Sequence, residues 1–151
     1  EDFTVTTSEE LFASVGTILT AVQAVFLAIA SISIIVGSIG MMNTMYTAVI
    51  ERTREIGILG AIGASRKDIL SLYILESVLV GMVGGLIGLL GGAGVGYLVG
   101  LAMKSAGIDV SPSVTWTLAV GVLALSGVLG AIAGFLPAKE ASSLHPVEAL
   151  A

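Results

Sequence analysis

The residues of this sequence that could do acid–base chemistry are eleven carboxylates, six Lys and Arg side chains and one histidine. Their densest run reads Glu51-Arg52-Thr53-Arg54-Glu55, where acidic and basic residues lie close together. General acid–base catalysis needs two groups whose surroundings push their pKa values apart, and this mixed run gives no such pair. We therefore expect the run to bind a partner rather than to catalyse a reaction.

Common catalytic and metal-binding patterns are missing from the sequence. It has no G-x-x-x-x-G-K-[ST] phosphate loop, no H-E-x-x-H and no G-x-S-x-G elbow, and His145 alone cannot form a metal cluster. Cysteine is absent, which excludes thiolate chemistry and disulfides. We predict that the protein is not an enzyme and that this chain carries no catalytic residue, cofactor or metal.

The composition is that of a membrane protein, with 56% hydrophobic and 11% charged residues. Residues 11–50, 77–103 and 110–138 contain no charged side chain. Each stretch exceeds the roughly 20 residues that a helix needs to cross about 30 Å of hydrocarbon. Six basic residues and a net charge of −5 leave no surface suited to nucleic acid. We predict an all-α integral membrane protein with three transmembrane helices and no nucleic-acid partner.

Basic residues that flank the spans predict their orientation, because Lys and Arg stay on the cytoplasmic side. Arg52, Arg54, Arg66 and Lys67 follow the first span, whereas Lys104 alone follows the second. The start of this segment should therefore lie outside and its end in the cytoplasm. The predicted division is 1–10 for the end of a missing extracytoplasmic domain and the start of a stalk, 11–50 for the first transmembrane helix, 51–67 for a cytoplasmic segment, 68–103 for the second helix, 104–112 for an external loop, 113–137 for the third helix and 138–151 for a cytoplasmic tail.

The first helix is predicted to be longer than the bilayer is thick. Thr7 and Glu10 form a capping-box pattern, and no helix-breaking signal follows before Glu51. At ~1.5 Å per residue this stretch is about 65 Å long. Its beginning should stand outside as a stalk that follows an extended segment at residues 3–6, the last strand of a missing domain. An amphipathic turn on the membrane surface is the alternative.

Five glycines in the second span recur every four residues, beside Gly81 and Gly85 on a neighbouring row; they are Gly84, Gly88, Gly92, Gly96 and Gly100. Four-residue spacing places them on one helix face, where another backbone can approach closely. We call these five residues the glycine row and predict that it is a helix-packing surface. Static packing and sliding of one helix against another both remain open.

Residues 51–67 carry the pattern of a short amphipathic helix between charged ends. Ile56, Leu59 and Ile62 or Gly63 fall on one helical face. An apolar face of this kind suits docking into a groove of another protein. A helix that lies on lipid headgroups, with its arginines holding anionic lipid, is an equally supported alternative.

Glu76 lies beside the second charge-free stretch. Ser65 and Asp68 form an N-cap pattern, which places Glu76 about eleven residues into the next helix. An ionisable group at membrane depth is a candidate for proton-relay chemistry. Glu76 has no acidic or histidine partner nearby in sequence, so we expect it at the cytoplasmic interface, or paired with Arg66, Lys67 or an arginine before the loop helix.

Several runs of this sequence resemble the FtsX-like permease domain, and within that superfamily its macrolide-exporter (MacB-like) branch. They are Asn43-Thr44-Met45, Glu51-Arg52-Thr53-Arg54-Glu55-Ile56-Gly57-Ile58-Leu59, Gly63-Ala64-Ser65, Leu75-Glu76, and the tail from Pro137-Ala138 to Pro146-Val147-Glu148-Ala149-Leu150. The resemblance covers nearly the whole chain and is most specific in the E-R-T-R-E-I-G and G-A-S motifs.

The resemblance implies four transmembrane helices with a large extracytoplasmic domain after the first, so that this chain would hold helices two to four. It also implies a homodimer or pseudo-dimer of permeases and a cytoplasmic ABC ATPase subunit that binds ATP and Mg. The loop between the second and third helices would be the coupling helix that docks on this ATPase. In this sequence it would comprise Arg52, Thr53, Arg54, Glu55, Ile56, Gly57, Leu59 and Ile62.

The implied function is an exporter permease that transmits ATP-driven motion to the extracytoplasmic side. Its place would be the cell membrane of a bacterium or archaeon, which is the inner membrane in a Gram-negative cell. Two alternatives stay open. One is a non-transporting regulator of an extracytoplasmic partner such as a cell-wall hydrolase, and the other is a structural helix bundle.

Overall fold

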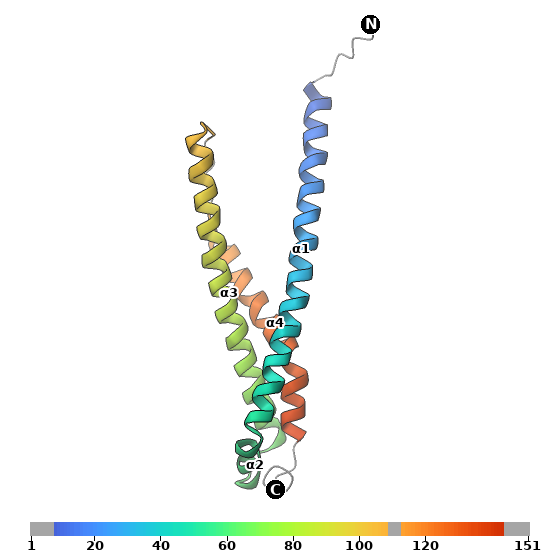
Figure 1. The fold of residues 1–151 in the computed structure, drawn as a ribbon, viewed down its shortest axis with the longest axis vertical. Helices are drawn as coiled ribbons and strands as arrows, with labels where there is room; N and C mark the ends of the chain where they lie inside the picture. The colour runs from blue at the N-terminus through green and yellow to red at the C-terminus, as the bar shows by residue number, and fades with distance from the viewer. Residues whose placement is uncertain (1–7, 109–112, 144–151) are drawn as a thin grey trace. The chain divides into compact units, whose positions relative to one another are not determined.

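The computed structural model describes residues 8–108 and 113–143, most of which lie in four α-helices (Figure 1). They are α1 (Ser8–Glu51), α2 (Thr53–Ala61), α3 (Arg66–Ser105) and α4 (Trp116–Ser143). No strand occurs within these described ranges, and α1, α3 and α4 are each long and apolar enough to cross a membrane. The predicted all-α fold with three candidate spans is confirmed.

Some sequence-based predictions fall outside the described residues. They are the extended segment at residues 3–6, the cap at Thr7, the loop around Asp109 and the end of the tail with His145. The chain divides into two compact units, residues 1–37 and 38–151, with the boundary inside α1. Each unit is described by itself.

The described part of the first unit is the beginning of α1, and residues 10–37 are exposed throughout. Five of its hydroxyl groups are satisfied within the helix, because each donates to the carbonyl four residues earlier at 2.8–2.9 Å. The donors are Ser14, Thr17, Thr20, Ser31 and Ser33. A helix with apolar side chains and internally paired hydroxyls suits lipid or another apolar helix.

In the second unit, two local signals mark where α2 ends and where α3 begins. Gly63 follows α2 at φ 106°, and the N–H of Ala64 donates to the Leu59 carbonyl at 3.0 Å, as in a Schellman motif. Ser65 then caps α3, because its Oγ accepts from the Asp68 N–H at 3.3 Å while the Asp68 carboxylate accepts from the Ser65 N–H at 2.9 Å. The predicted N-cap at Ser65 is confirmed.

α3 and α4 pack against each other through small residues (Figure 1). The residues that meet recur every four positions on both helices: Ser77, Gly81 and Gly85 of α3, and Ser126, Gly130 and Gly134 of α4. We call these six residues the α3–α4 contact row. A Cβ on Gly130 would lie 2.5 Å from the Ser77 carbonyl oxygen, so the backbones approach this closely only because the side chain is missing.

The glycine row is a different face of α3. A Cβ on Gly84, Gly88 or Gly92 would meet nothing within 4 Å in the described part of the chain. Gly96 is half-buried and Gly100 is buried. The first three of these glycines therefore have no close neighbour among the described residues, and the packing of the row against another helix stays a prediction.

α4 continues through Pro137 to Ser143, past residue 137, where the sequence places the end of the third span. Proline removes one backbone donor from the helix, and here it is buried next to small residues such as Gly134 and Ala138. The helical residues after Ala138 include the exposed Lys139. α4 therefore carries charge beyond the apolar segment without ending there.

A small core joins all four helices near α2. Its buried residues are Met45 and Val49 of α1, Ile56 of α2, Ile69 and Tyr73 of α3, and Ala138 and Ala141 of α4. α2 is thus fixed to the ends of three long helices.

Candidate functional site

α2 turns one face toward this core. Ile56 is 2% exposed and Gly57 is buried, with Leu59 and Gly60 half-buried beside them. Because Gly57 and Gly60 have no side chains, the backbone of α2 can lie close to its neighbours. The sequence places Ile56 on a docking face. In the structure its side chain is buried, so it packs α2 against the rest of the chain and cannot contact a partner.

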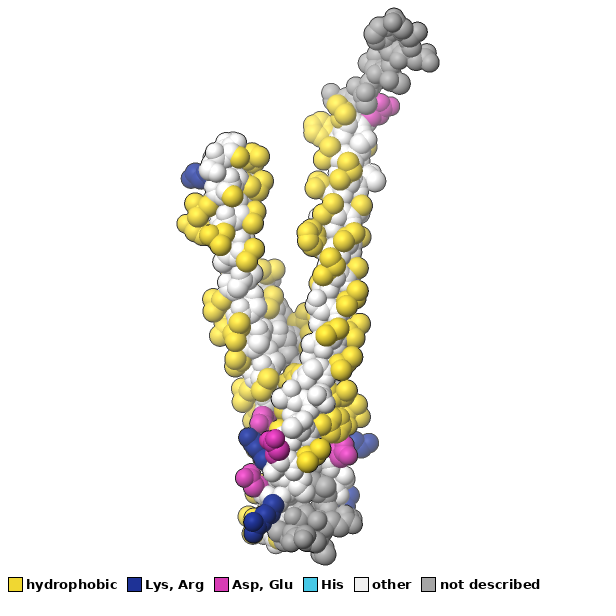
Figure 2. All heavy atoms as spheres, in the orientation of Figure 1, with side chains coloured by type: hydrophobic (Ala, Val, Ile, Leu, Met, Phe, Trp, Pro, Cys, Tyr) yellow, Lys and Arg dark blue, Asp and Glu magenta, His cyan; other side chains and the backbone are white. Residues whose placement is uncertain are grey.

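The other side of α2 combines one basic residue with exposed apolar side chains. Arg54, Ile58, Ala61 and Ile62 fall on one helical face and are all exposed, Ile58 by 46% and Ile62 by 76%. We call these four residues the outer face of α2. Figure 2 shows acidic and basic side chains gathered around this end of the second unit. Apolar side chains framed by charges are typical of a surface that another molecule covers.

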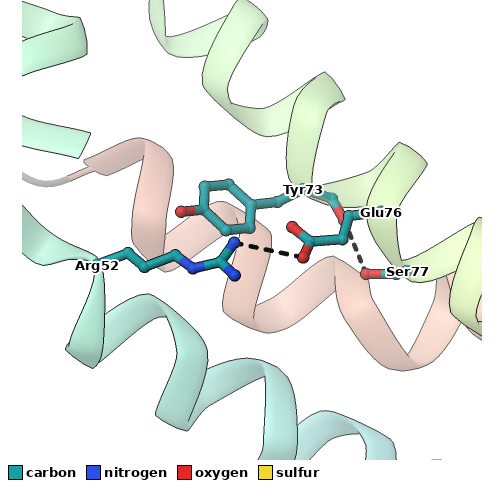
Figure 3. A network of polar contacts seen from close by, with 4 residues as sticks. All are labelled: Arg52, Tyr73, Glu76 and Ser77. Atoms are coloured by element: carbon teal, nitrogen blue, oxygen red, sulfur yellow. Dashed lines mark hydrogen bonds and ion pairs between the residues drawn. The ribbon is translucent and has the colours of Figure 1, made fainter. Parts of the chain in front are cut away.

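Arg52, between α1 and α2, forms an ion pair with Glu76 of α3 (Figure 3). Nη1 of Arg52 lies 3.5 Å from Oε1 of Glu76, and the two side chains are 53% and 38% exposed. Close to the pair, Tyr73 is buried and its carbonyl accepts a 2.8 Å hydrogen bond from the Ser77 hydroxyl. The structure thus gives Glu76 an arginine partner from before the loop helix, one of the arrangements that the sequence allows. A pair this exposed contributes about 0–1 kcal/mol.

A groove of about 420 Å³ lies between α2 and α3, and we call it the α2–α3 groove. Its charged lining residues are Arg52, Glu55 and Glu76. Its apolar lining, with Tyr73, comes from Ile56 and Leu59 of α2 and from Leu72, Leu75, Leu79 and Val80 of α3. The groove therefore crosses the point on α3, at Ser77, where the charge-free stretch begins.

A second groove, of about 310 Å³, lies between α3 and the beginning of α4. Gly88, Gly92 and Gly96 of the glycine row line it together with apolar residues such as Leu89 and Leu118. None of its described lining residues is titratable. This part of the glycine row offers a surface for packing, with no group suited to catalysis.

Three residues that shape this end of the chain were not predicted from the sequence. Tyr73 lies next to the Arg52–Glu76 pair, and Gly130 and Gly134 of α4 pack against Ser77 of α3. A signal for the two glycines was present, because Ser126, Gly130 and Gly134 repeat the four-residue spacing that is conspicuous in the second span. Tyr73 gave no such signal, since a lone tyrosine near a membrane boundary is common.

The family model described as FtsX-like permease C-terminal matches residues 27–146, which is most of the chain. The chain belongs to the FtsX-like permease family. The matched range includes α2, the Arg52–Glu76 pair and the α3–α4 contact row. With three helices long and apolar enough to cross a membrane, this family member is a multi-pass membrane protein.

Three relatives show how much of a longer protein this family member resembles. An uncharacterised ABC transporter permease of Methanocaldococcus jannaschii is 38% identical over 151 residues, which are 99% of this chain and 38% of that protein. The uncharacterised ABC transporter permease YknZ of Bacillus subtilis is 39% identical over 99% of this chain and 36% of its own length. The macrolide export ATP-binding/permease protein MacB of Hahella chejuensis is 41% identical over 100% of this chain and 22% of its own length. The chain thus spans less than half of each relative.

Proposed function

We propose that this chain is the permease part of an ABC-type exporter and transmits ATP-driven motion from a cytoplasmic ATPase to the extracytoplasmic side. The two faces of α2 carry the proposal. Ile56 is fixed in a core shared with α1, α3 and α4, while the outer face of α2 is exposed. Because packed interiors deform little, a force on the outer face would reach the three long helices through this core.

In this proposal α2 is the coupling helix, and its outer face makes the contact with the ATPase. ATP and Mg bind to the ATPase, since this sequence has no phosphate loop. The relatives named as ABC transporter permeases and as a macrolide export protein support the assignment. A second permease, identical or related, completes the assembly.

If α2 is the coupling helix, the beginning of α1 extends from the extracytoplasmic side of the membrane. α2 and its arginines lie in the cytoplasm, so the beginning of α1 and Lys104 lie outside. α1 has 44 residues, and at ~1.5 Å per residue it is about 66 Å long, against about 30 Å of hydrocarbon. Its first part therefore extends outside the membrane as a stalk.

The test is co-purification of the full-length protein with its proposed cytoplasmic ABC ATPase, together with permease-stimulated ATP hydrolysis. Reversing the outer-face charge with Arg54→Glu should weaken association about tenfold, since it removes the charge that Arg54 brings to the proposed contact. Lys104→Glu is the matched control, because it makes the same charge change at the opposite end of α3. Unchanged association and hydrolysis in Arg54→Glu would overturn the proposal.

A further inference from the structure

The α2–α3 groove has the properties of a lipid-binding site. The proposed coupling role of α2 does not require such a site. Its walls include Leu72, Leu75, Leu79 and Val80, each about half exposed. They lie along α3 on both sides of Ser77, where the charge-free stretch starts. One end of the groove is therefore level with headgroups and the other with acyl chains, whichever side of the membrane α2 occupies.

The charges of the groove distinguish between kinds of headgroup. Arg52 supplies one positive charge, and Glu55 and Glu76 supply two negative charges. A headgroup that carries only a phosphate would be attracted by the guanidinium but repelled by two carboxylates. A headgroup with a phosphate and a nearby ammonium group satisfies both signs at once.

We propose that the α2–α3 groove binds a phospholipid with a primary-amine headgroup of the phosphatidylethanolamine type. Its phosphate is bound by Arg52, which has five N–H donors and uses one nitrogen, Nη1, in the 3.5 Å contact with Glu76. Its ammonium group donates to the carboxylates of Glu76 and Glu55. One acyl chain lies along Leu75, Leu79 and Val80, while the headgroup lies at Arg52 and Glu76, which face each other in Figure 3.

The chemistry predicts an order of preference among lipids. Phosphatidylcholine carries a quaternary ammonium without N–H groups, so it cannot donate hydrogen bonds to Glu76 and Glu55. Phosphatidylglycerol has no cationic group. Its phosphate would therefore lie beside the carboxylates of Glu55 and Glu76 and be repelled by them. Loss of charged hydrogen bonds of this kind weakens binding about tenfold. The amine lipid should therefore be retained about tenfold over each of the other two.

The experiment is native mass spectrometry of the purified protein with an equimolar mixture of phosphatidylethanolamine, phosphatidylglycerol and phosphatidylcholine that have identical acyl chains. Glu76→Gln should remove the preference for the amine lipid, and Arg52→Gln should reduce retention of all three. Glu51→Gln is the matched control, since Glu51 is exposed nearby but does not line the groove. Equal retention of the three lipids by the unaltered protein, or a preference for phosphatidylglycerol, would overturn the proposal.

A second measurement does not depend on the variants being folded. A phosphatidylethanolamine with a photoreactive acyl chain should crosslink within residues 72–80 of the unaltered protein. Crosslinks confined to other segments, or occupation of the groove by a protein segment instead of lipid, would contradict the site. Neither measurement involves the ATPase, so failure of this site and failure of the coupling role are distinguishable.

Discussion

Ser77 of α3 fills the space that a side chain on Gly134 of α4 would need. A Cβ on Gly134 would overlap the Ser77 Oγ, and one on Gly130 would lie 2.5 Å from the Ser77 carbonyl oxygen. The Ser77 hydroxyl is held in place by its 2.8 Å hydrogen bond to the Tyr73 carbonyl. Around Ser77, the close approach of α3 and α4 thus depends on the missing side chains of Gly130 and Gly134.

Gly130→Ala should destabilise the protein by about 1–3 kcal/mol, because the new methyl group meets a backbone oxygen that cannot rotate away. Circular dichroism during detergent-induced unfolding of the purified protein measures the difference. Gly121→Ala on the same helix is the matched control, since its Cβ would meet nothing within 4 Å. Equal stabilities of the two variants would show that α3 and α4 are not in this close contact.

The local parts of this structure could be predicted from sequence. Three charge-free stretches and the pair Ser65 and Asp68 depend only on neighbouring residues, and the structure confirms the helices and the cap. Neighbouring residues alone could not show which row of small residues on α3 packs against α4. A helix carries several four-residue rows, and the longest series of glycines in α3 is not the one that meets α4, because only the fold decides which face has a neighbour.

The same limit applies to α2. Its amphipathic pattern predicted an apolar face, and the structure contains one. The pattern could not say whether the chain itself or a partner covers that face. Ile56 lies in the core while Ile62 is exposed, so the group that the sequence joined on one face is divided by the fold.

That division can be measured with two substitutions on or next to the same short helix. Ile56→Ala should cost about 2–5 kcal/mol of unfolding free energy, because it leaves a cavity in the core. Ile62→Ala should change stability by less than about 0.5 kcal/mol and instead weaken binding to the ATPase. Unfolding and co-purification of both variants decide the matter. If Ile62→Ala were the more destabilising of the two, the faces of α2 would be reversed.

The glycine row makes a separate prediction about two copies of the chain. Gly92→Leu should leave a single chain folded, since a Cβ there would meet no described residue of another helix within 4 Å. It should reduce disulfide crosslinking between two copies that carry Val95→Cys, because bulk on a close helix contact keeps backbones apart. Gly94→Leu, an exposed glycine of α3 outside the row, is the control. Unchanged crosslinking in Gly92→Leu would remove the row from any contact between chains.

The Arg52–Glu76 pair should make a small but measurable contribution to the free energy of unfolding. A double-mutant cycle with Arg52→Ala, Glu76→Ala and both together should give a coupling energy of about 0.2–1 kcal/mol, as expected for two partly exposed side chains. Raising the salt concentration to ~1 M should lower this coupling, because the screening length falls to about 3 Å. A coupling energy well above 1 kcal/mol that does not fall with salt would contradict a partly exposed pair.

Orientation is the prediction on which the role of α2 depends, because a coupling helix must reach the cytoplasm. These 151 residues contain no cysteine, so Arg54→Cys and Lys104→Cys each place one thiol in this part of the protein. A membrane-impermeant maleimide added to intact cells should label Lys104→Cys, whereas Arg54→Cys should react only after the membrane is opened. The opposite pattern would place α2 outside, where no ATP-driven partner could act on its outer face. Labelling of both sites in opened membranes verifies that each thiol is accessible.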